Sequence, residues 1–483
     1  MKDLKKFSQI HKFVKHLNYK NNTFYNKKIR ENILLILFII VSIFFLIVYL
    51  NISAEYEKPE LDNSDAFGYL NEGIHLRDVS YDFREIINRN RTPGLPLIIS
   101  FLAQNKGPLI QNSEEYIELF KETQLAIILF VFLISFISFL KIKNKFRSNI
   151  LIIFFFIYFY SVPITAQMGW VYVEPIFMSL YLLFIITAID VMKSNVRKDH
   201  IILGLVGGFL FLAKYTGFLI FIFTIFSLLI YKIFFLKNND FVQILINLFL
   251  SFVTFVTVGL PYIIANISDG INPFYSVNAK IMWYSSATEA EAYWAKYGGN
   301  FGFKDIPENL YPSLTYFLNN NGGYDGLIDR IMRGIYHLKD DFSDVGKLAG
   351  ETLMYSFFLL GLIIFISIIV SVSVTHTSLW NNFKKHLFEI FFLVSLTSVL
   401  LFGFLLYHHI SNGNRIYLFI TIPIIYYLFY LVDYFLTYTN FEGKKKIVFN
   451  SFLISCFVYF NLIIYDVFWF LLHPLGFIKG LFT

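Results

Sequence analysis

Long apolar runs, broken by short polar stretches, most constrain how this chain folds. We read eleven of these runs as membrane segments, since a helix needs roughly 20 residues to cross the hydrocarbon core of a bilayer and most of the runs approach that length. Inside a bilayer each backbone N–H and C=O must be paired within the protein, so the runs are expected to be helices. They cover residues 33–51, 123–140, 148–163, 171–190, 200–213, 216–236, 241–266, 353–374, 387–407, 415–436 and 447–472. The sequence therefore predicts an all-α protein, a polytopic membrane helical bundle of about eleven segments.

The composition agrees with a membrane protein and limits its partners. Of 483 residues, 56% are hydrophobic and only 15% are charged, whereas soluble domains carry roughly 25% charged residues. The formal net charge of +6 does not indicate nucleic-acid binding, because membrane proteins concentrate basic residues in cytoplasmic loops. The single cysteine, Cys456, lies in an apolar run, so no intrachain disulfide can form. We expect membrane lipids among the partners, and no nucleic acid.

The positions of the basic residues predict the orientation of the helices. Nine lysines and arginines precede the first apolar run, so residues 1–32 are expected to form a basic cytoplasmic tail. Every second short loop is basic as well, with Lys141, Lys143, Lys145, Arg147, Lys193, Arg197, Lys198, Lys232, Lys237, Lys384, Lys385, Lys444, Lys445 and Lys446. Eleven crossings then put the tail 473–483 outside. The chain is expected in a bacterial inner or plasma membrane.

Two long loops, 52–122 and 267–352, face outward in this topology. Residues 93–104 are apolar but too few to cross a membrane, which predicts a helix on the membrane surface. In the second loop, apolar residues recur at helical spacing from Leu327 to Leu338, which predicts an amphipathic surface helix. Residues 33–472 are therefore expected to form one transmembrane domain whose two outward-facing loops contain interfacial helices.

The first outer loop carries charged residues that suit chemistry on an anionic substrate. Asp65 opens a helical pattern and is a candidate general base, although an acidic residue in a first turn also stabilises the helix itself. Arg91 stands two residues before Pro93, through which a helix does not continue. Its guanidinium would bind a phosphate through two hydrogen bonds, or else anchor the loop to lipid headgroups.

Two further charged residues lie at the ends of apolar runs. Glu174 precedes Pro175 at the outer start of the fourth run, where it is either a second candidate catalytic carboxylate or a structural residue of the helix start. Lys214 separates two runs, the first of which, 200–213, is short for a crossing. Short, interrupted segments often line a cavity in a membrane protein, which makes Lys214 a candidate phosphate ligand. The alternative is a lysine that extends its ammonium to the membrane interface.

A third group precedes the tenth run. Arg415 is expected on the outer side and is another candidate phosphate ligand. His408 and His409 are possible acid/base groups, or polar residues of an exposed turn, and they lack the spaced partners of a metal site. The chain has no nucleotide-binding glycine loop and no Gly-x-Ser-x-Gly motif. We predict no metal site and no cofactor, with metal dependence left open, and a donor that arrives through the membrane already activated.

Five segments resemble the polyprenyl-phosphate-sugar-dependent membrane glycosyltransferases of the GT-C class, which include the protein O-mannosyltransferases and the lipid A aminoarabinose transferases. These segments are Asp65, Arg91-Thr92-Pro93-Gly94-Leu95-Pro96, Glu174-Pro175, Ala213-Lys214-Tyr215-Thr216-Gly217 and Asn414-Arg415-Ile416-Tyr417. Their order and the long first outer loop carry the resemblance, which spans most of the membrane region from 33 to 436. One departure concerns the second carboxylate: several relatives carry Asp-Glu where this chain has Asp65-Ala66.

The resemblance implies a GT-C-like fold with an outward-facing cavity and a sugar donor of the polyprenyl-phosphate type. The chain is then an enzyme, an integral-membrane glycosyltransferase that passes a sugar to a glycan, lipid or protein acceptor on the outer side, with inversion at the anomeric carbon. Asp65 would be the catalytic base, with Glu174 as a distant partner, and Arg91, Lys214 and Arg415 would hold the donor phosphate. The alternatives are a transporter or flippase for a lipid-linked glycan, and a scaffold in a cell-envelope complex.

Overall fold

The computed structural model describes a chain whose regular elements, where it is described, are all helices. The described residues are 31–50, 53, 64–82, 92–107, 113–146, 149–161, 171–235, 241–268, 272–274, 282–297 and 312–344, with isolated positions between 392 and 433. No strand occurs among these residues. The all-α prediction is therefore confirmed for this part of the chain.

Among the described residues, five helices are long and apolar enough to cross a membrane. They are Glu31–Leu50, Glu114–Ile142 (α4), Glu174–Lys193 (α7), Thr216–Ile233 within α9 (Thr216–Phe235), and Phe241–Ser268 (α10). Each of the five contains a stretch of membrane length with few charges, so a membrane location is supported. α4 begins nine residues before the predicted start at 123, which shortens the first loop at its end.

Other predicted segments are shorter or lie outside the described residues. The described part of α5 (Asn149–Ser161) has 13 residues, and α8 (Arg197–Ala213) has 17. The predicted segments 353–374, 387–407, 415–436 and 447–472 lie outside the described residues, apart from isolated positions. The count of eleven crossings and the GT-C fold therefore remain predictions.

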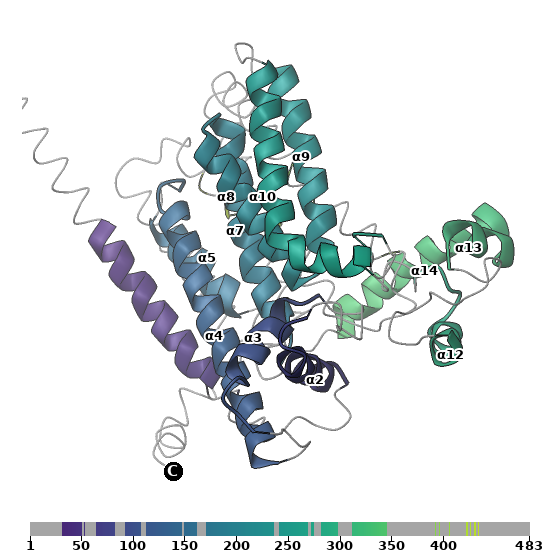
Figure 1. The fold of residues 1–483 in the computed structure, drawn as a ribbon. Helices are drawn as coiled ribbons and strands as arrows, with labels where there is room; N and C mark the ends of the chain where they lie inside the picture. The colour runs from purple at the N-terminus through teal and green to yellow at the C-terminus, as the bar shows by residue number, and fades with distance from the viewer. Residues whose placement is uncertain are drawn as a thin grey trace, which may run out of the picture.

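α7 forms the centre of the described bundle. Its most apolar stretch is 94% buried inside the protein, whereas that of the helix Glu31–Leu50 is 22% buried. α8 packs against both α7 and α10, with α9 beside them, so these four helices stand side by side (Figure 1). α7 carries apolar residues around its whole circumference, which suits a helix with protein on every side.

The first loop contributes two helices at one end of this bundle (Figure 1). α2 (Ser64–Asp78) packs against α3 (Gly94–Leu102), and α3 also contacts α4 and α8. Leu95 and Ile99 of α3 are fully buried, while Phe101 is 62% exposed. The helix predicted over 93–104 is thus confirmed as a helix, and one of its faces packs on the bundle.

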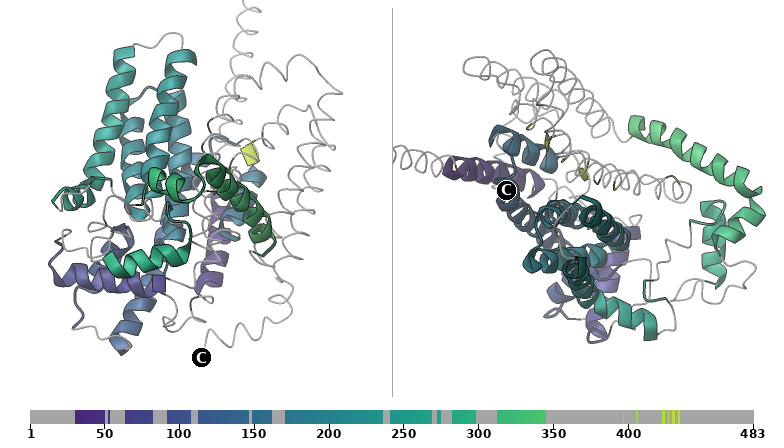
Figure 2. Two further views of the ribbon diagram at one scale, coloured as in Figure 1. Left: turned by 90° about the vertical axis from the view of Figure 1, so that its right-hand side faces the viewer. Right: turned by 90° about the horizontal axis from the view of Figure 1, so that it is seen from above.

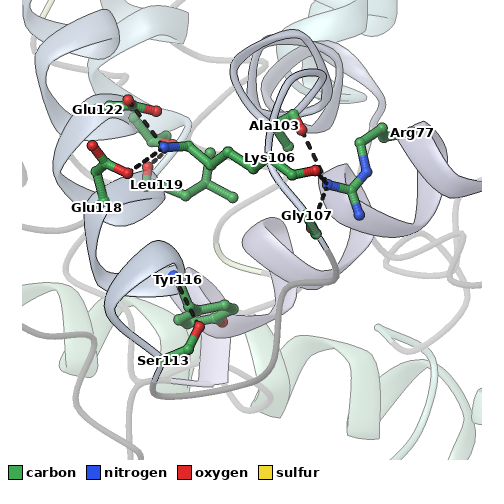
Figure 3. A network of polar contacts seen from close by, with 10 residues as sticks. Arg77, Ala103, Lys106, Gly107, Ser113, Tyr116, Glu118, Leu119 and Glu122 are labelled. Carbon is green, nitrogen blue, oxygen red and sulfur yellow. Dashed lines mark hydrogen bonds and ion pairs between the residues drawn. The ribbon is translucent and has the colours of Figure 1, made fainter.

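Two cations fix α2, α3 and α4 to one another (Figure 3). The Arg77 guanidinium, in the last turn of α2, donates to three carbonyl oxygens after α3, among them that of Ala103 at 3.0 Å. Lys106 Nζ reaches α4, where it lies 2.7 Å from Glu118 Oε2 and 3.2 Å from Glu122 Oε1. Carbonyl groups at a helix C-terminus have no partner inside the helix. Arg77 therefore satisfies the end of α3 and sets its position.

The described part of the second loop forms three helices set apart from the bundle (Figure 2). They are α12 (Ala287–Tyr297), α13 (Leu314–Asn320) and α14 (Gly323–Asp344). The buried Arg330 of α14 donates to the carbonyl oxygens of Met282 and Tyr284 at 2.7 and 2.6 Å, and its guanidinium lies 3.8 Å from the ring centroid of Phe317. The amphipathic helix predicted around 327–338 is confirmed as part of α14, and its contact with the bilayer stays a prediction.

Basic residues from separate loops meet at the end of the bundle opposite α3. Lys141 and Lys145, which come at and after the end of α4, pair with Asp190 of α7, with Lys141 Nζ 3.2 Å from the carboxylate. Lys232 of α9 donates to the carbonyl oxygen of Ser194 at 2.9 Å. The recurrence of basic residues in every second short loop predicts that these lysines lie on one side of the membrane. In the structure they share one end of the bundle. The side itself stays a prediction.

Candidate functional site

Glu174 and Lys214 lie at the same end of two neighbouring antiparallel helices. Glu174 is the first residue of α7, and Pro175 follows in the first turn, where its missing backbone N–H costs nothing. Lys214 directly follows the last residue of α8, with φ −155° and ψ 138°. A carboxylate near a helix N-terminus and an ammonium near a C-terminus are both favoured by the helix dipole. Each side chain is therefore at the stabilising end of its own helix.

The two side chains form an ion pair. Lys214 Nζ lies 3.0 Å from Glu174 Oε1. The Glu174 side chain is 6% exposed and that of Lys214 is 27% exposed, so the ammonium is the partner that solvent reaches. The contact joins a candidate catalytic carboxylate to a candidate phosphate ligand 40 residues further along the chain.

The second carboxylate oxygen of Glu174 has no partner in the part of the chain that the structure describes. Glu174 Oε2 is buried and accepts no hydrogen bond there. The hydroxyl of Tyr181, seven residues later and so on the same face of α7, is also buried and has no partner among the described residues. An unsatisfied buried polar group costs about 1–3 kcal/mol. Two such groups on one face of the central helix mark this region as a candidate site.

The start of α3 packs onto the same end of α8. Thr92 is buried, and its Oγ1 donates to the carbonyl oxygen of Ala213 at 2.7 Å, which satisfies a group at the C-terminus of α8. A Cβ atom on Gly94 would lie 2.6 Å from the carbonyl oxygen of Leu212, so glycine is what lets the two backbones approach this closely. These contacts hold the first loop next to Lys214.

A tight turn between α8 and α9 fixes the backbone of Lys214. Its N–H donates to the carbonyl oxygen of Leu210 at 3.0 Å, and its own carbonyl oxygen accepts from the N–H of Gly217 at 2.8 Å. A Cβ atom on Gly217 would lie 2.5 Å from the backbone of Leu210. The turn thus sets the point from which the Lys214 side chain extends to Glu174.

The structure brings Glu174 and Lys214 together, and it does not describe the side chains of the other predicted site residues. Asp65 is the second residue of α2, which agrees with the predicted helix start. Its side chain is outside the described part of the structure. Arg91, Arg415, His408 and His409 lie outside the described residues altogether, and their roles stay predictions.

The residue after Asp65 is a buried alanine. Ala66 is fully buried in the core, together with Leu70 one turn later. A glutamate in place of Ala66 would put a charge into apolar packing, which is very costly without a partner. The packing around Ala66 therefore disfavours an Asp-Glu pair at this point.

Thr92, Gly94 and Tyr181 contribute to this region, yet the sequence alone assigned them no role. The hydrogen bond from Thr92 spans 121 residues of chain and leaves no local pattern. The close approach at Gly94 depends on the backbone of α8 in the same way. Tyr181 had a usable signal, because its spacing of seven residues from Glu174 puts both side chains on one helix face.

The arrangement is suited to holding an anion. An ammonium acts as a point charge toward phosphate, and the buried carboxylate of Glu174 sets the position of this one. No family model matches the chain, and no curated protein matches its sequence.

Proposed function

We propose that the protein is an integral-membrane glycosyltransferase that moves one sugar from a polyprenyl phosphate to an acceptor hydroxyl. The observation that carries the proposal is the Lys214 ammonium, held 3.0 Å from Glu174 Oε1 where the start of α3 packs on α8. The donor phosphate would bind at this ammonium while its prenyl chain stays among apolar helices. The charge pattern of the loops supports a position of this end of the bundle on the outer, periplasmic or extracellular side.

The proposed reaction needs a base and a group that stabilises the departing phosphate. Asp65 takes the proton of the acceptor hydroxyl as its oxygen attacks the anomeric carbon, a role typically worth about 10²–10⁴-fold in rate. The bond from the anomeric carbon to the phosphate oxygen breaks, and the electron pair leaves with the polyprenyl phosphate. Lys214, with Arg91 and Arg415, stabilises the charge that grows on this phosphate. Attack opposite the leaving group inverts the anomeric carbon.

Identification of the bound lipid is the first test of this function. Purified full-length protein should retain a lipid-linked sugar that mass spectrometry identifies. The same donor, labelled in its sugar, should then yield a glycosylated acceptor and free polyprenyl phosphate in equal amounts.

The transporter alternative predicts a different outcome from the same donor. In sealed vesicles, a transporter would move the intact donor across the bilayer and leave its sugar–phosphate bond uncut. Transport without any release of polyprenyl phosphate would contradict the glycosyltransferase proposal.

A further inference from the structure

We propose that Glu174 weakens the hold of Lys214 on the spent phosphomonoester, and so serves product release as a residue that acts through Lys214. This inference rests on the proposed function, because it concerns the relative affinities of the same site for the donor and the product. The structural basis is the pairing of a 27% exposed ammonium with a 6% exposed carboxylate at 3.0 Å.

The charge on the phosphate changes during the proposed reaction. A sugar-linked polyprenyl phosphate is a phosphodiester with one negative charge. The product is a phosphomonoester, whose second ionisation near pH 6 gives it about −1.5 to −2 charges at pH 7. A phosphate site made of cations alone would therefore bind its product more tightly than its donor, which slows product release.

Glu174 offsets this difference. The charges of Lys214 and Glu174 cancel within the pair, and the carboxylate is the more buried of the two partners. A phosphate that reaches the exposed ammonium is attracted by Lys214 and repelled by Glu174 from slightly further away. Repulsion grows with each negative charge on the phosphate, so it acts more strongly on the product than on the donor.

The half-satisfied state of the carboxylate agrees with this role. Glu174 Oε2 accepts no hydrogen bond from the described residues, although it is buried. A carboxylate present only to stabilise the fold gains most when both oxygens are bonded. Here one oxygen is used to place Lys214, and the remaining negative charge is not quenched by a second donor among the described residues.

Two short-chain probes test the inference by direct binding. Farnesyl phosphate represents the monoester, and the methyl diester of farnesyl phosphate represents the donor linkage. Binding of each to the full-length protein in detergent is measured at pH 7.5 for wild type and for the variants Glu174→Gln, Glu174→Asp and Lys214→Met. Glu115→Gln, at an exposed position in the first turn of α4, is the matched control.

We expect Glu174→Gln to tighten the monoester by about tenfold and the diester by less. Glu174→Asp, which keeps the charge, should restore the wild-type ratio of the two affinities. Lys214→Met should weaken both probes, and Glu115→Gln should change neither. Thermal unfolding of each variant, followed in parallel, shows that the compared proteins are folded.

Weaker monoester binding in Glu174→Gln, or equal changes for the two probes, would overturn the inference, since Glu174 would then only orient Lys214. The outcome is independent of the transfer assay. If the affinities shift as expected and no donor yields a glycosylated acceptor, the charge selection stands and the glycosyltransferase proposal fails.

Discussion

The hydroxyl of Thr92 donates a 2.7 Å hydrogen bond to the carbonyl oxygen of Ala213, the last residue of α8. This bond ties the first long loop to the residue just before Lys214. Arg77 and Lys106 tie the far end of α3 to α2 and α4. The loop is thus attached at both ends of α3, and displacement of α3 should be transmitted to Lys214.

Replacement of Thr92 by valine should destabilise the protein. Valine keeps the shape but removes the donor, which leaves the Ala213 carbonyl oxygen buried without this partner, at a cost of about 1–3 kcal/mol. The midpoint of thermal unfolding should fall. Thr257→Val is the control, because Thr257 is exposed and its hydroxyl donates to the carbonyl oxygen of Val253 in its own helix α10. Equal midpoints for the two variants would show that the Thr92 bond is not needed.

Substitution of Gly94 by alanine should harm both stability and activity. The added Cβ would lie 2.6 Å from the Leu212 carbonyl oxygen, so α3 must move away from α8, at a cost of about 1–3 kcal/mol. Gly107→Ala is the matched control, because nothing lies within 4 Å of its Cβ position. Gly94→Ala should have a lower unfolding midpoint and a lower transfer rate than Gly107→Ala. Wild-type values for Gly94→Ala would contradict the close approach of α3 to α8.

The Lys106 ion pairs should stabilise the protein at neutral pH and lose their effect only in strong alkali. Burial lowers the pKa of Lys106, but hydrogen bonds to Glu118 and Glu122 outweigh it and raise this pKa above 10.5. A raised lysine pKa gives stability that is complete below the unfolded value and is lost as pH rises through the folded value. Lys106→Met should lower stability by about 0.5–1 kcal/mol at pH 7.

The pH dependence supplies the check on this pairing. Unfolding free energies of wild type and Lys106→Met should differ by a constant amount from pH 7 to about pH 9, and should converge above about pH 10.5. A difference that instead disappears near neutral pH would mean that another group supplies the stabilisation.

Loss of the Lys214 charge should act on donor binding. Lys214→Met should raise the donor KM by about 10–100-fold, because a hydrogen bond to a charged group contributes about 1.5–3 kcal/mol. The acceptor KM should change little. Lys121→Met, at an exposed position on α4, makes the same chemical change away from the site. Equal effects of Lys214→Met on both KM values would show that Lys214 is not a specific ligand of the donor, and would favour a lysine that extends its ammonium to the membrane interface.

Loss of the Asp65 charge should act on turnover instead. Asp65→Asn keeps the size of the side chain and most of its hydrogen bonding. If Asp65 only stabilises the helix end, the substitution should lower stability by about 0.5–2 kcal/mol and leave kcat unchanged. A lost general base should lower kcat at least about 100-fold with donor binding intact. Near wild-type kcat would exclude Asp65 as the base and make Glu174 the leading candidate.

Much of the described helical framework could be predicted from apolar runs. The predicted segments 171–190 and 241–266 agree with α7 and α10 to within about three residues at each end. The start of α4 could not be found this way, because its first turns carry Glu114 and Glu115 and are capped by the Ser113 hydroxyl. Hydropathy detects the length of an apolar run. A capped polar turn makes the helix longer but leaves the apolar run unchanged.

The contacts of the candidate site were less predictable. Glu174 and Lys214 were each identified from charge at the end of an apolar run, but their pairing depends on how α7 packs against α8. Thr92 and Gly94 act through backbone atoms of α8, which carry no side-chain signature in the sequence. Local patterns predict which residues are candidates, while long-range packing decides which of them meet.

The shortness of α8 has a consequence for where the reaction takes place. Its 17 residues span only about 26 Å at 1.5 Å per residue, less than the roughly 30 Å of a bilayer's hydrocarbon core. If α8 crosses the bilayer with its basic start at one interface, as the predicted topology requires, Lys214 at the other end lies a few ångströms below the opposite interface. A phosphate bound there must sink below its usual headgroup level, or the bilayer must thin around the bundle, at a cost that rises with hydrophobic mismatch. For the proposed transferase, we therefore expect faster turnover in bilayers of short acyl chains than in bilayers of long ones.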